Sequence, residues 1–171
     1  MNADYRIRPA THADVPLLAE VERAAATLFE AVGYGELAST VCEPALLHEA
    51  VEHQRLWVAV DGRDQPIGFA VAEWIDGTPY LHELDVHPDH GRRGIGAALL
   101  KTVCEWARAC GAQVVMLSTF RSVPWNAPFY ARHGFGEVDL GALTPGFVSL
   151  RANEATHFPI EDRVIMRRTF Q

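Results

Sequence analysis

The chain has 171 residues, of which 49% are hydrophobic and 22% are charged, and its net charge is −7. This length favours one domain over residues 1–171, and the composition is ordinary for a soluble globular protein. The negative charge argues against a nucleic-acid binder, and no segment approaches the roughly 20 apolar residues of a membrane span. The cysteines, Cys42, Cys104 and Cys110, form no CxxC pair and predict buried or half-buried free thiols in a reducing cytoplasm.

The first third of the chain predicts a short strand followed by two helices. Residues 5–8 alternate between the two faces of a strand. Apolar residues recur at helical spacing from Leu18 to Val32, and Gly33 is a suitable C-terminal stop. A second helix opens at Pro44, a residue suited to a first helical turn, and runs toward His53.

The pattern then changes to that of strands. Apolar, β-branched and aromatic residues are concentrated in Leu56 to Val60, Ile67 to Ile75 and Tyr80 to Val86. The dipeptides Asp61-Gly62 and Asp76-Gly77 lie between these runs and are typical of tight turns. The three runs therefore predict an antiparallel meander.

A glycine-rich turn then leads into a long helix. The predicted apolar stripe of this helix consists of Ile95, Leu99, Val103, Trp106 and Cys110, with Gly111 as its end.

The remaining predicted elements are a strand at Val114–Phe120, a helix at Ala127–His133 stopped by Gly134, a helix around Phe147–Ala155 and a strand at Arg163–Arg168. Strands and helices in this order predict an α+β fold. Its one parallel connection joins Tyr80–Val86 to Val114–Phe120 through the long helix. Helices on both faces of the sheet would explain why the central strands are so apolar.

The turn before the long helix, HPDHGRRGIG from His87 to Gly96, is the most informative segment. Glycine lets the backbone approach a ligand closely, and the free amides of a helix start attract phosphate. Arg92 and Arg93 add positive charge. The GxxGxG spacing differs from the GxGxxG of dinucleotide-binding folds, and no Gly-Lys-Ser/Thr follows. The segment predicts an anion site, with a tight turn that holds no ligand as the alternative.

This segment resembles motif A of the GNAT superfamily of N-acetyltransferases, in which a Gln/Arg-x-x-Gly-x-Gly/Ala loop holds the pyrophosphate of acetyl-CoA. Gly94 and Gly96 match the glycines of that motif. Gly91 stands where the family usually has Gln or Arg, so Arg92 or Arg93 is the candidate for the missing charge.

A second segment, NAPFYARHGF from Asn126 to Phe135, resembles motif B of the same family, with Tyr130, Gly134 and Phe135 in register. The resemblance covers Ile67 to Phe135. It implies a GNAT fold, with a mixed central β-sheet of about six or seven strands and helices on both faces.

The resemblance also implies acetyl-CoA as co-substrate, with direct transfer to an amine in a ternary complex. Because neither motif contains a cysteine or serine, no covalent acyl-enzyme is expected. The residues expected to bind the coenzyme are Leu84, Asp85, Val86, Arg92, Arg93, Gly94, Ile95, Gly96, Ala97, Asn126 and Phe129. An amide near Leu84 to Val86 is expected to stabilise the oxyanion, and Tyr130 to protonate the departing thiolate.

The base that deprotonates the amine has two candidates in one strand. His82 corresponds by position to a histidine that serves as the base in a member of the family, and histidine is poised near neutral pH. Glu83 is the rival, and a water chain is the third possibility. Strand alternation places Tyr80, His82 and Leu84 on one face and Glu83 with Asp85 on the other, unless a β-bulge intervenes.

The acceptor is expected to be a small cationic amine. In related folds the loop between the first two helices lines the acceptor site, which here corresponds to Gly33 to Glu43. The rings and carboxylates expected to hold an ammonium group are Phe29, Tyr34, Glu30, Glu36 and Glu43. The alternative for these residues is a packed core with a solvated acidic face.

Two other functions remain open: a module that binds or senses acyl-CoA without catalysis, and a protein or peptide N-acetyltransferase. No metal is expected, although His87 and His90 form an HxxH pattern in the turn. As partners we expect a small-molecule amine, no nucleic acid and no membrane, and a homodimer is compatible with the sequence. The expected location is the cytoplasm.

Overall fold

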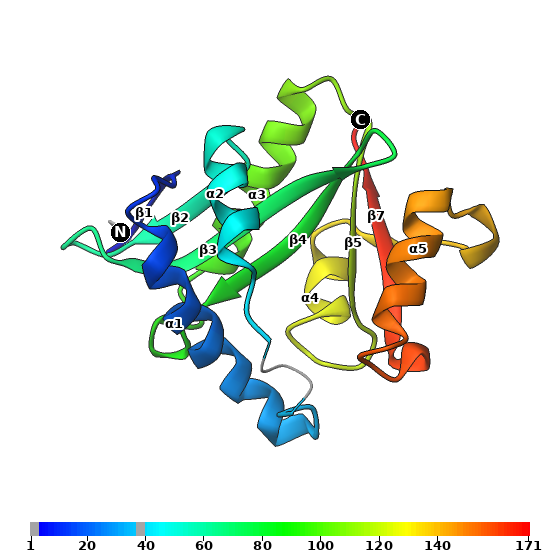
Figure 1. The fold of residues 1–171 in the computed structure, drawn as a ribbon, viewed down its shortest axis with the longest axis horizontal. Coiled ribbons are helices and arrows are strands. Elements are labelled where there is room, and N and C mark those ends of the chain that lie inside the picture. The colour runs from blue at the N-terminus through cyan, green and yellow to red at the C-terminus, as the bar shows by residue number, and fades with distance from the viewer. Residues whose placement is uncertain (1–3, 37–39) are drawn as a thin grey trace. The chain divides into compact units, whose positions relative to one another are not determined.

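The computed structural model describes residues 4–36 and 40–171. It contains a seven-stranded sheet in which the strands are hydrogen-bonded in the order β1-β2-β3-β4-β5-β7-β6 (Figure 1). The strands are β1 Arg6–Pro9, β2 Leu56–Val60, β3 Pro66–Ile75, β4 Thr78–Val86, β5 Val114–Phe120, β6 Gly136–Glu137 and β7 Arg163–Thr169. The α-helices are α1 Val15–Ala26, α2 Pro44–Glu52, α3 Ile95–Ala109, α4 Ala127–Arg132 and α5 Pro145–Glu154.

The pairing makes this a mixed sheet. β1 with β2, β2 with β3, β5 with β7 and β6 with β7 are antiparallel. β4 and β5 are parallel, with Tyr80 opposite Met116 and Leu81 opposite Leu117. The predicted parallel connection through α3 is therefore confirmed, since a parallel pair needs a long crossover of this kind.

The chain divides into two compact units, which we describe separately. The N-terminal unit comprises Met1–Ala72 and Glu83–Val103, and the C-terminal unit comprises Glu73–His82 and Cys104–Gln171. β3, β4 and α3 each contribute residues to both units. That residues 1–171 form one domain stays a prediction.

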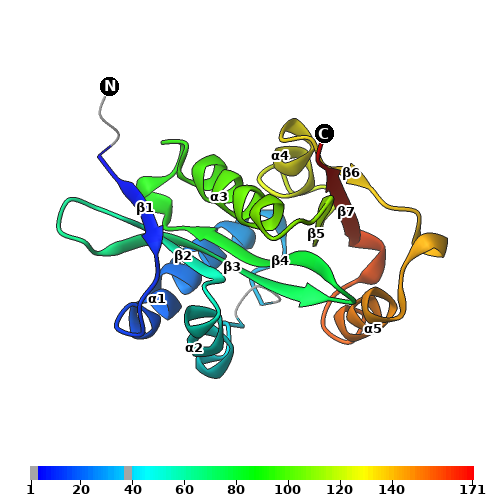
Figure 2. The same ribbon diagram turned by 90° about the horizontal axis from the view of Figure 1, so that it is seen from above.

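The N-terminal unit has helices on both faces of its strands. Leu18 and Val21 of α1 and Leu47 of α2 share a buried cluster with Phe69 and Val71 of β3. Gly68 precedes Phe69 and therefore lies on the opposite face of the strand. A Cβ atom on Gly68 would lie 3.3 Å from Ile95 and 3.4 Å from Leu99 of α3. α3 therefore covers the face opposite to α1 and α2 (Figure 2).

The C-terminal unit follows the same rule. Phe147 of α5 packs in a buried cluster with Tyr80, Met116 and Ile165. Arg168, on the other face of β7, contacts Cys104 of α3 and approaches Gly134 at the end of α4. Together the two units confirm the expected mixed sheet with helices on both faces.

Several predicted details of the elements were wrong. The helix predicted through Val32 ends at Ala26 and continues as a 3-10 segment over Thr27–Val32. In α3 the predicted stripe holds for Ile95, Leu99 and Val103, but Cys110 lies beyond the helix end and its thiol is exposed. Cys104 and Ala107 are buried instead. None of the helices in the described part of the chain is long and apolar enough to cross a membrane.

Candidate active site

β4 carries the candidate base and several expected coenzyme contacts. Residues 79–81 of this strand are buried, whereas every residue from His82 to Val86 is only half-buried. The parallel register with β5 covers Tyr80 and Leu81. The five candidate residues of this strand, His82 to Val86, therefore follow the buried segment and the residues paired with β5.

His82 lies against a carboxylate. Its ring nitrogen Nδ1 is paired with Oε1 of Glu73, which lies nine positions earlier in β3. The ring also meets Tyr80 edge-on, with ring centroids 6.4 Å apart. Tyr80 in turn packs edge-on against Phe147 of α5 at 5.9 Å. Tyr80 and His82 were expected on the same face of this strand, and their rings are in contact in the C-terminal unit.

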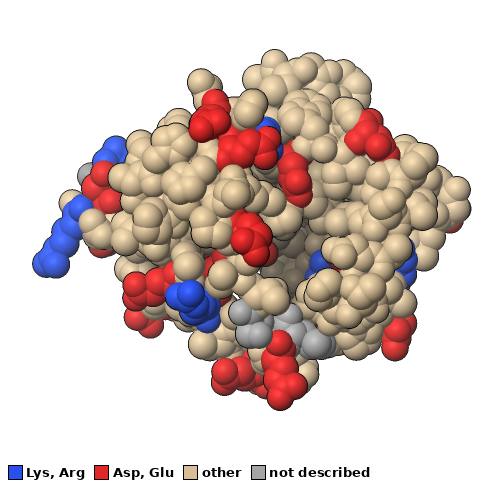
Figure 3. All heavy atoms as spheres, viewed as in Figure 1, with Lys and Arg blue, Asp and Glu red and all other residues tan. Residues whose placement is uncertain are grey.

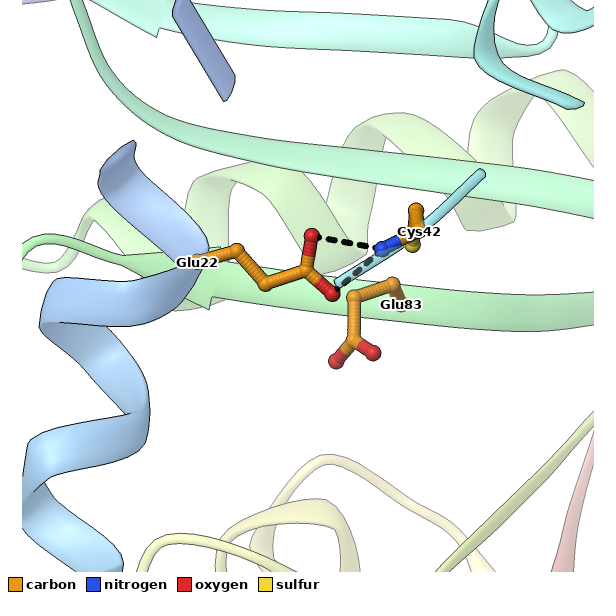
Figure 4. A group of neighbouring side chains, drawn as sticks. All are labelled: Glu22, Cys42 and Glu83. Carbon is orange, nitrogen blue, oxygen red and sulfur yellow. Dashed lines mark hydrogen bonds between the residues drawn. The ribbon is translucent and has the colours of Figure 1, made fainter. Parts of the chain in front are cut away.

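Glu83 lies in a different environment, beside Glu22 of α1 and Cys42 (Figure 4). One carboxylate oxygen of each glutamate and the thiol sulfur of Cys42 all lie within 4.8 Å of one another. Glu22 is only 6% exposed, and both its carboxylate oxygens accept a hydrogen bond from the Cys42 amide at 2.9 Å. We refer to Glu22, Glu83 and Asp85 as the carboxylate cluster, because Asp85 interacts electrostatically with the other two.

The carboxylate cluster is a like-charge group in which Glu22 is buried and Glu83 and Asp85 are half-buried. Loss of solvation raises the pKa of Asp85 well above its ordinary value, and the charges of Glu83 and Glu22 raise it further. Burial and the same carboxylates raise the pKa of the Cys42 thiol. Cys42 therefore stays protonated at neutral pH, which makes it a poor nucleophile.

Glu22 was not singled out from the sequence, although a signal existed. It lies on the same face of α1 as Leu18, Val21 and Ala25, all of which are buried. A carboxylate on the apolar stripe of a helix is uncommon, because burying a charge is costly. That position could have marked Glu22 as a candidate. Glu73 carries no comparable signal, because its role depends on which residue of β4 it meets.

The glycine turn opens α3 in the expected way. Arg92 and Gly94 have positive φ angles of 60° and 78°. The amide of Ala98 bonds to the carbonyl of Gly94 at 3.0 Å, so the amides of residues 95–97 precede this first helical hydrogen bond. A Cβ atom on Gly94 would meet the Tyr5 hydroxyl at 3.9 Å. These features make the helix start a suitable place for an anion.

The two arginines of the turn are exposed and have different surroundings. Arg93 donates a hydrogen bond to Nδ1 of His90 at 2.9 Å and lies 3.8 Å from the carboxylate of Asp4. The amide of Asp89 donates to Nδ1 of His87 at 3.2 Å. Nδ1 of each histidine in the HxxH pattern thus forms a hydrogen bond within the turn. The expectation that the turn binds no metal stays a prediction.

The second predicted motif folds as a loop followed by a short helix. The Oδ1 atom of Asn126 accepts a hydrogen bond from the Thr119 hydroxyl at 2.6 Å, and the Asn126 carbonyl accepts from the Tyr130 amide at 3.0 Å. Tyr130 is only 9% exposed and packs edge-on against Phe129 and Phe135. The motif thus holds Tyr130 in one orientation through packing on both sides.

The expected acceptor residues are distributed along the end of the first helical region and the loop that follows. Phe29 and Tyr34 are half-buried, and the Tyr34 amide bonds to the Phe29 carbonyl at 2.9 Å. Glu30, Glu36 and Glu43 are exposed. Residues 37–39 of the predicted acceptor loop lie outside the described residues.

Comparison with known proteins identifies the family. The acetyltransferase (GNAT) family profile matches residues 20–135, which is more than half of the chain. This chain belongs to that family. The matched region includes Glu22, the β4 candidates, the glycine turn and Tyr130, so both predicted motifs lie within it.

One curated relative is an uncharacterised N-acetyltransferase from Methanocaldococcus jannaschii, with 32% identity over 83 residues. The match covers 44% of this chain and 37% of the relative, so the chain spans well under two thirds of that protein.

Solved structures share the fold. A PaiA N-acetyltransferase from Thermoplasma acidophilum in complex with coenzyme A has a TM-score of 0.69 at 20% identity, covering 97% of this chain and 99% of that one. An N-acetylglutamate synthase from Neisseria gonorrhoeae, with coenzyme A and N-acetylglutamate, has a TM-score of 0.75 at 17% identity and covers 100% of this chain and 36% of that one. The predicted family and fold are therefore confirmed.

Proposed function

We propose that this acetyltransferase moves an acetyl group from acetyl-CoA to the amine of a small cationic molecule, by direct attack in a ternary complex. The observation that carries the proposal is the open start of α3, with its left-handed Arg92 and Gly94, inside the region matched by the family. Coenzyme A is present in the Thermoplasma and Neisseria structures that share the fold, which supports acetyl-CoA as co-substrate.

In this proposal the coenzyme meets two parts of the chain. Its pyrophosphate binds the amides of residues 95–97, with charge from Arg92 or Arg93. Its pantetheine arm runs along Leu84, Asp85 and Val86 of β4, where amide groups of the arm can pair with the strand backbone. Asn126 and Phe129 complete the coenzyme contacts.

The chemistry then needs deprotonation of the acceptor, stabilisation of the oxyanion and protonation of the departing thiolate. His82 takes a proton from the acceptor ammonium, whose neutral form is scarce at pH 7 because alkylamines have pKa values near ~10.4. The amine nitrogen attacks the thioester carbonyl, and an amide of residues 84–86 stabilises the oxyanion. The C–S bond breaks and Tyr130 gives its proton to the thiolate. The second proton that the amine nitrogen must lose passes to the Tyr130 phenolate as the amide forms. Glu83 remains the rival base.

The preference for a cationic acceptor is supported by charge. Three carboxylates of the N-terminal unit, Glu22, Glu83 and Asp85, form a like-charge group in which Glu83 and Glu22 raise the pKa of Asp85. A bound ammonium relieves this like-charge repulsion, whereas an acidic acceptor increases it. Acidic side chains are also more widespread than basic ones on the face seen in Figure 3.

A turnover assay tests this proposal. Acetyl-CoA is offered with a panel of cationic, neutral and acidic amines, and both CoA thiol release and the acetylated product are measured. We expect activity with cationic amines and a higher acceptor KM when Glu30, Glu36 and Glu43 are changed together to glutamine. A clear preference for acidic acceptors, or an unchanged KM in that triple variant, would contradict the acceptor class. Absence of turnover with tight acetyl-CoA binding would favour the sensing module instead.

A further inference from the structure

Glu73 and His82 form a carboxylate–imidazole pair that the proposed chemistry does not yet use. Their side chains are 33% and 32% exposed, so the pair is partly shielded and partly accessible to solvent. The contact is made through Nδ1 of the imidazole. Nε2, the other ring nitrogen, is therefore separate from the contact with Glu73.

A carboxylate at Nδ1 determines how the imidazole can act. Glu73 accepts the Nδ1 proton, which selects the tautomer in which Nε2 carries a lone pair. Such a nitrogen can take a proton from an ammonium group. Once it does, the adjacent carboxylate stabilises the imidazolium that forms, as in other sites where an acid orients a catalytic histidine.

The hairpin that carries this pair is anchored. Asp76, in the turn between β3 and β4, accepts hydrogen bonds from the Thr144 hydroxyl at 2.5 Å and the Gly146 amide at 2.6 Å, both at the start of α5. Thus α5 holds the turn while Phe147 packs on Tyr80. An orienting residue needs such support, because a small displacement of a catalytic group costs much of its effect.

The groups around the His82 ring identify Glu73 as its charged partner. Tyr80 meets the ring from the same strand, and the side of Tyr80 that faces α5 is covered by the apolar Phe147. Glu83, the next residue in β4, has its carboxylate beside Glu22 and Cys42. Glu73 contacts the ring nitrogen directly.

We infer that Glu73 is a positioning residue, which orients His82 through Nδ1 so that Nε2 receives the proton of the acceptor ammonium. The inference rests on the proposed function and adds a residue to it. The reaction step stays balanced. One ammonium proton moves to Nε2, the amine lone pair forms the new C–N bond, and the C–S bond breaks. Tyr130 protonates the thiolate and regains a proton from the amide nitrogen, and Glu73 keeps its own charge throughout.

The test compares Glu73→Gln with Glu73→Asp and with a control pair elsewhere. Glu49 of α2 and His53, the residue that follows this helix, form an exposed acid–imidazole pair at 3.9 Å, so Glu49→Gln removes the same charge outside the proposed site. For Glu73→Gln we expect kcat/KM to fall about tenfold or more. In the plot of kcat/KM against pH, the midpoint of the acidic limb should move to lower pH. Glu73→Asp should retain the limb position, and Glu49→Gln should change neither.

A second readout does not depend on turnover. In ¹⁵N NMR spectra of the free protein, neutral His82 should carry its proton on Nδ1, and Glu73→Gln should shift it toward a mixture of tautomers. A proton on Nε2 in the unchanged protein would overturn the inference. The inference would also be overturned if His82→Ala abolished the acidic limb of the kcat/KM profile while Glu73→Gln left that profile unaltered. In that case the proposed function would still stand. If no amine is acetylated, the proposed function fails, while the NMR result still decides the orientation.

Discussion

Two adjacent residues of β4 are placed in opposite electrostatic environments. The imidazole of His82, which can become a cation, contacts the Glu73 carboxylate in the C-terminal unit. Glu83 meets groups of its own charge, Glu22 and Asp85, in the N-terminal unit. The first environment places a carboxylate at an imidazole nitrogen, and the second disfavours a full set of carboxylate charges.

This difference assigns the two environments different tasks. A base must accept a proton and pass it on, which an oriented imidazole does near neutral pH. A cluster of like charges around the buried Glu22 is better suited to hold a cation, since positive charge removes the repulsion within it. We therefore assign proton transfer to His82 and acceptor charge recognition to the carboxylate cluster, and the predictions below separate the two.

The largest effect is expected from Tyr130→Phe, which removes the proposed acid and leaves both base candidates in place. Because thiolate departure then lacks its proton donor, kcat should fall by about 10²-fold. The acidic limb of the pH profile and the dissociation constant of acetyl-CoA should be unchanged, as steady-state kinetics and calorimetry will show. An unaltered kcat would mean that Tyr130 serves packing alone.

The next effect concerns the glycine turn, which lies in the same unit as the carboxylate cluster. Gly94→Val forces a branched side chain into a backbone with a φ of 78°, at the point where phosphate must approach. Acetyl-CoA affinity should fall tenfold or more, which corresponds to about 1.4 kcal/mol.

Gly111→Val is the matched control for that experiment. Gly111 has a comparable φ of 82°, and no heavy atom lies within 4 Å of its added Cβ in the described part of the chain. It should lose stability without losing coenzyme affinity. Equal affinity in folded Gly94→Val and in the unchanged protein would exclude the turn as the pyrophosphate site.

A smaller effect is expected from Glu22→Gln, which removes one charge of the carboxylate cluster and keeps an oxygen for the Cys42 amide. The KM of a cationic acceptor should rise about fivefold, the equivalent of roughly 1 kcal/mol. The KM of a neutral amine should not change. Glu20, an exposed carboxylate on the same helix, supplies the control Glu20→Gln. A similar rise for both amines would show that Glu22 acts on structure instead.

The smallest effect is on stability. Because the pKa of Asp85 is raised in the folded protein, the unfolded chain loses this proton first as the pH rises, and wild-type stability falls above about pH 4. Asp85→Asn removes that loss, so it should raise the free energy of unfolding at pH 7 by on the order of 1 kcal/mol. Urea denaturation at pH 4 should show little gain. The same gain at both pH values would argue against the raised pKa.

Much of the fold could be predicted because its signals are local. The predicted bounds of β2 and β5 match the structure, since β2 is a continuous apolar run and β5 is rich in β-branched and apolar residues. Gly33, Gly111 and Gly134 all have positive φ angles where helix stops were predicted. The strand β6 was missed because its two residues carry no periodicity, and its pairing with β7 is a tertiary property.

The site could be predicted only in part. His82, Glu83 and Tyr130 could be named as candidates because their positions follow from motifs and strand alternation, and their place in the site stays a prediction. Their partners Glu73 and Glu22 were not found, because the contacts depend on how β3 lies beside β4 and how α1 lies over the strands. A single sequence contains neither of these relations. The assignment of catalytic roles to these residues stays a prediction.

The pH dependence of kcat/KM, measured side by side for the wild type, His82→Ala and Glu83→Ala, tests the central claim most directly. If His82 takes the proton, the acidic limb persists in Glu83→Ala and is flattened in His82→Ala. A limb that survives in His82→Ala and disappears in Glu83→Ala would contradict the account and transfer the role of base to the carboxylate cluster.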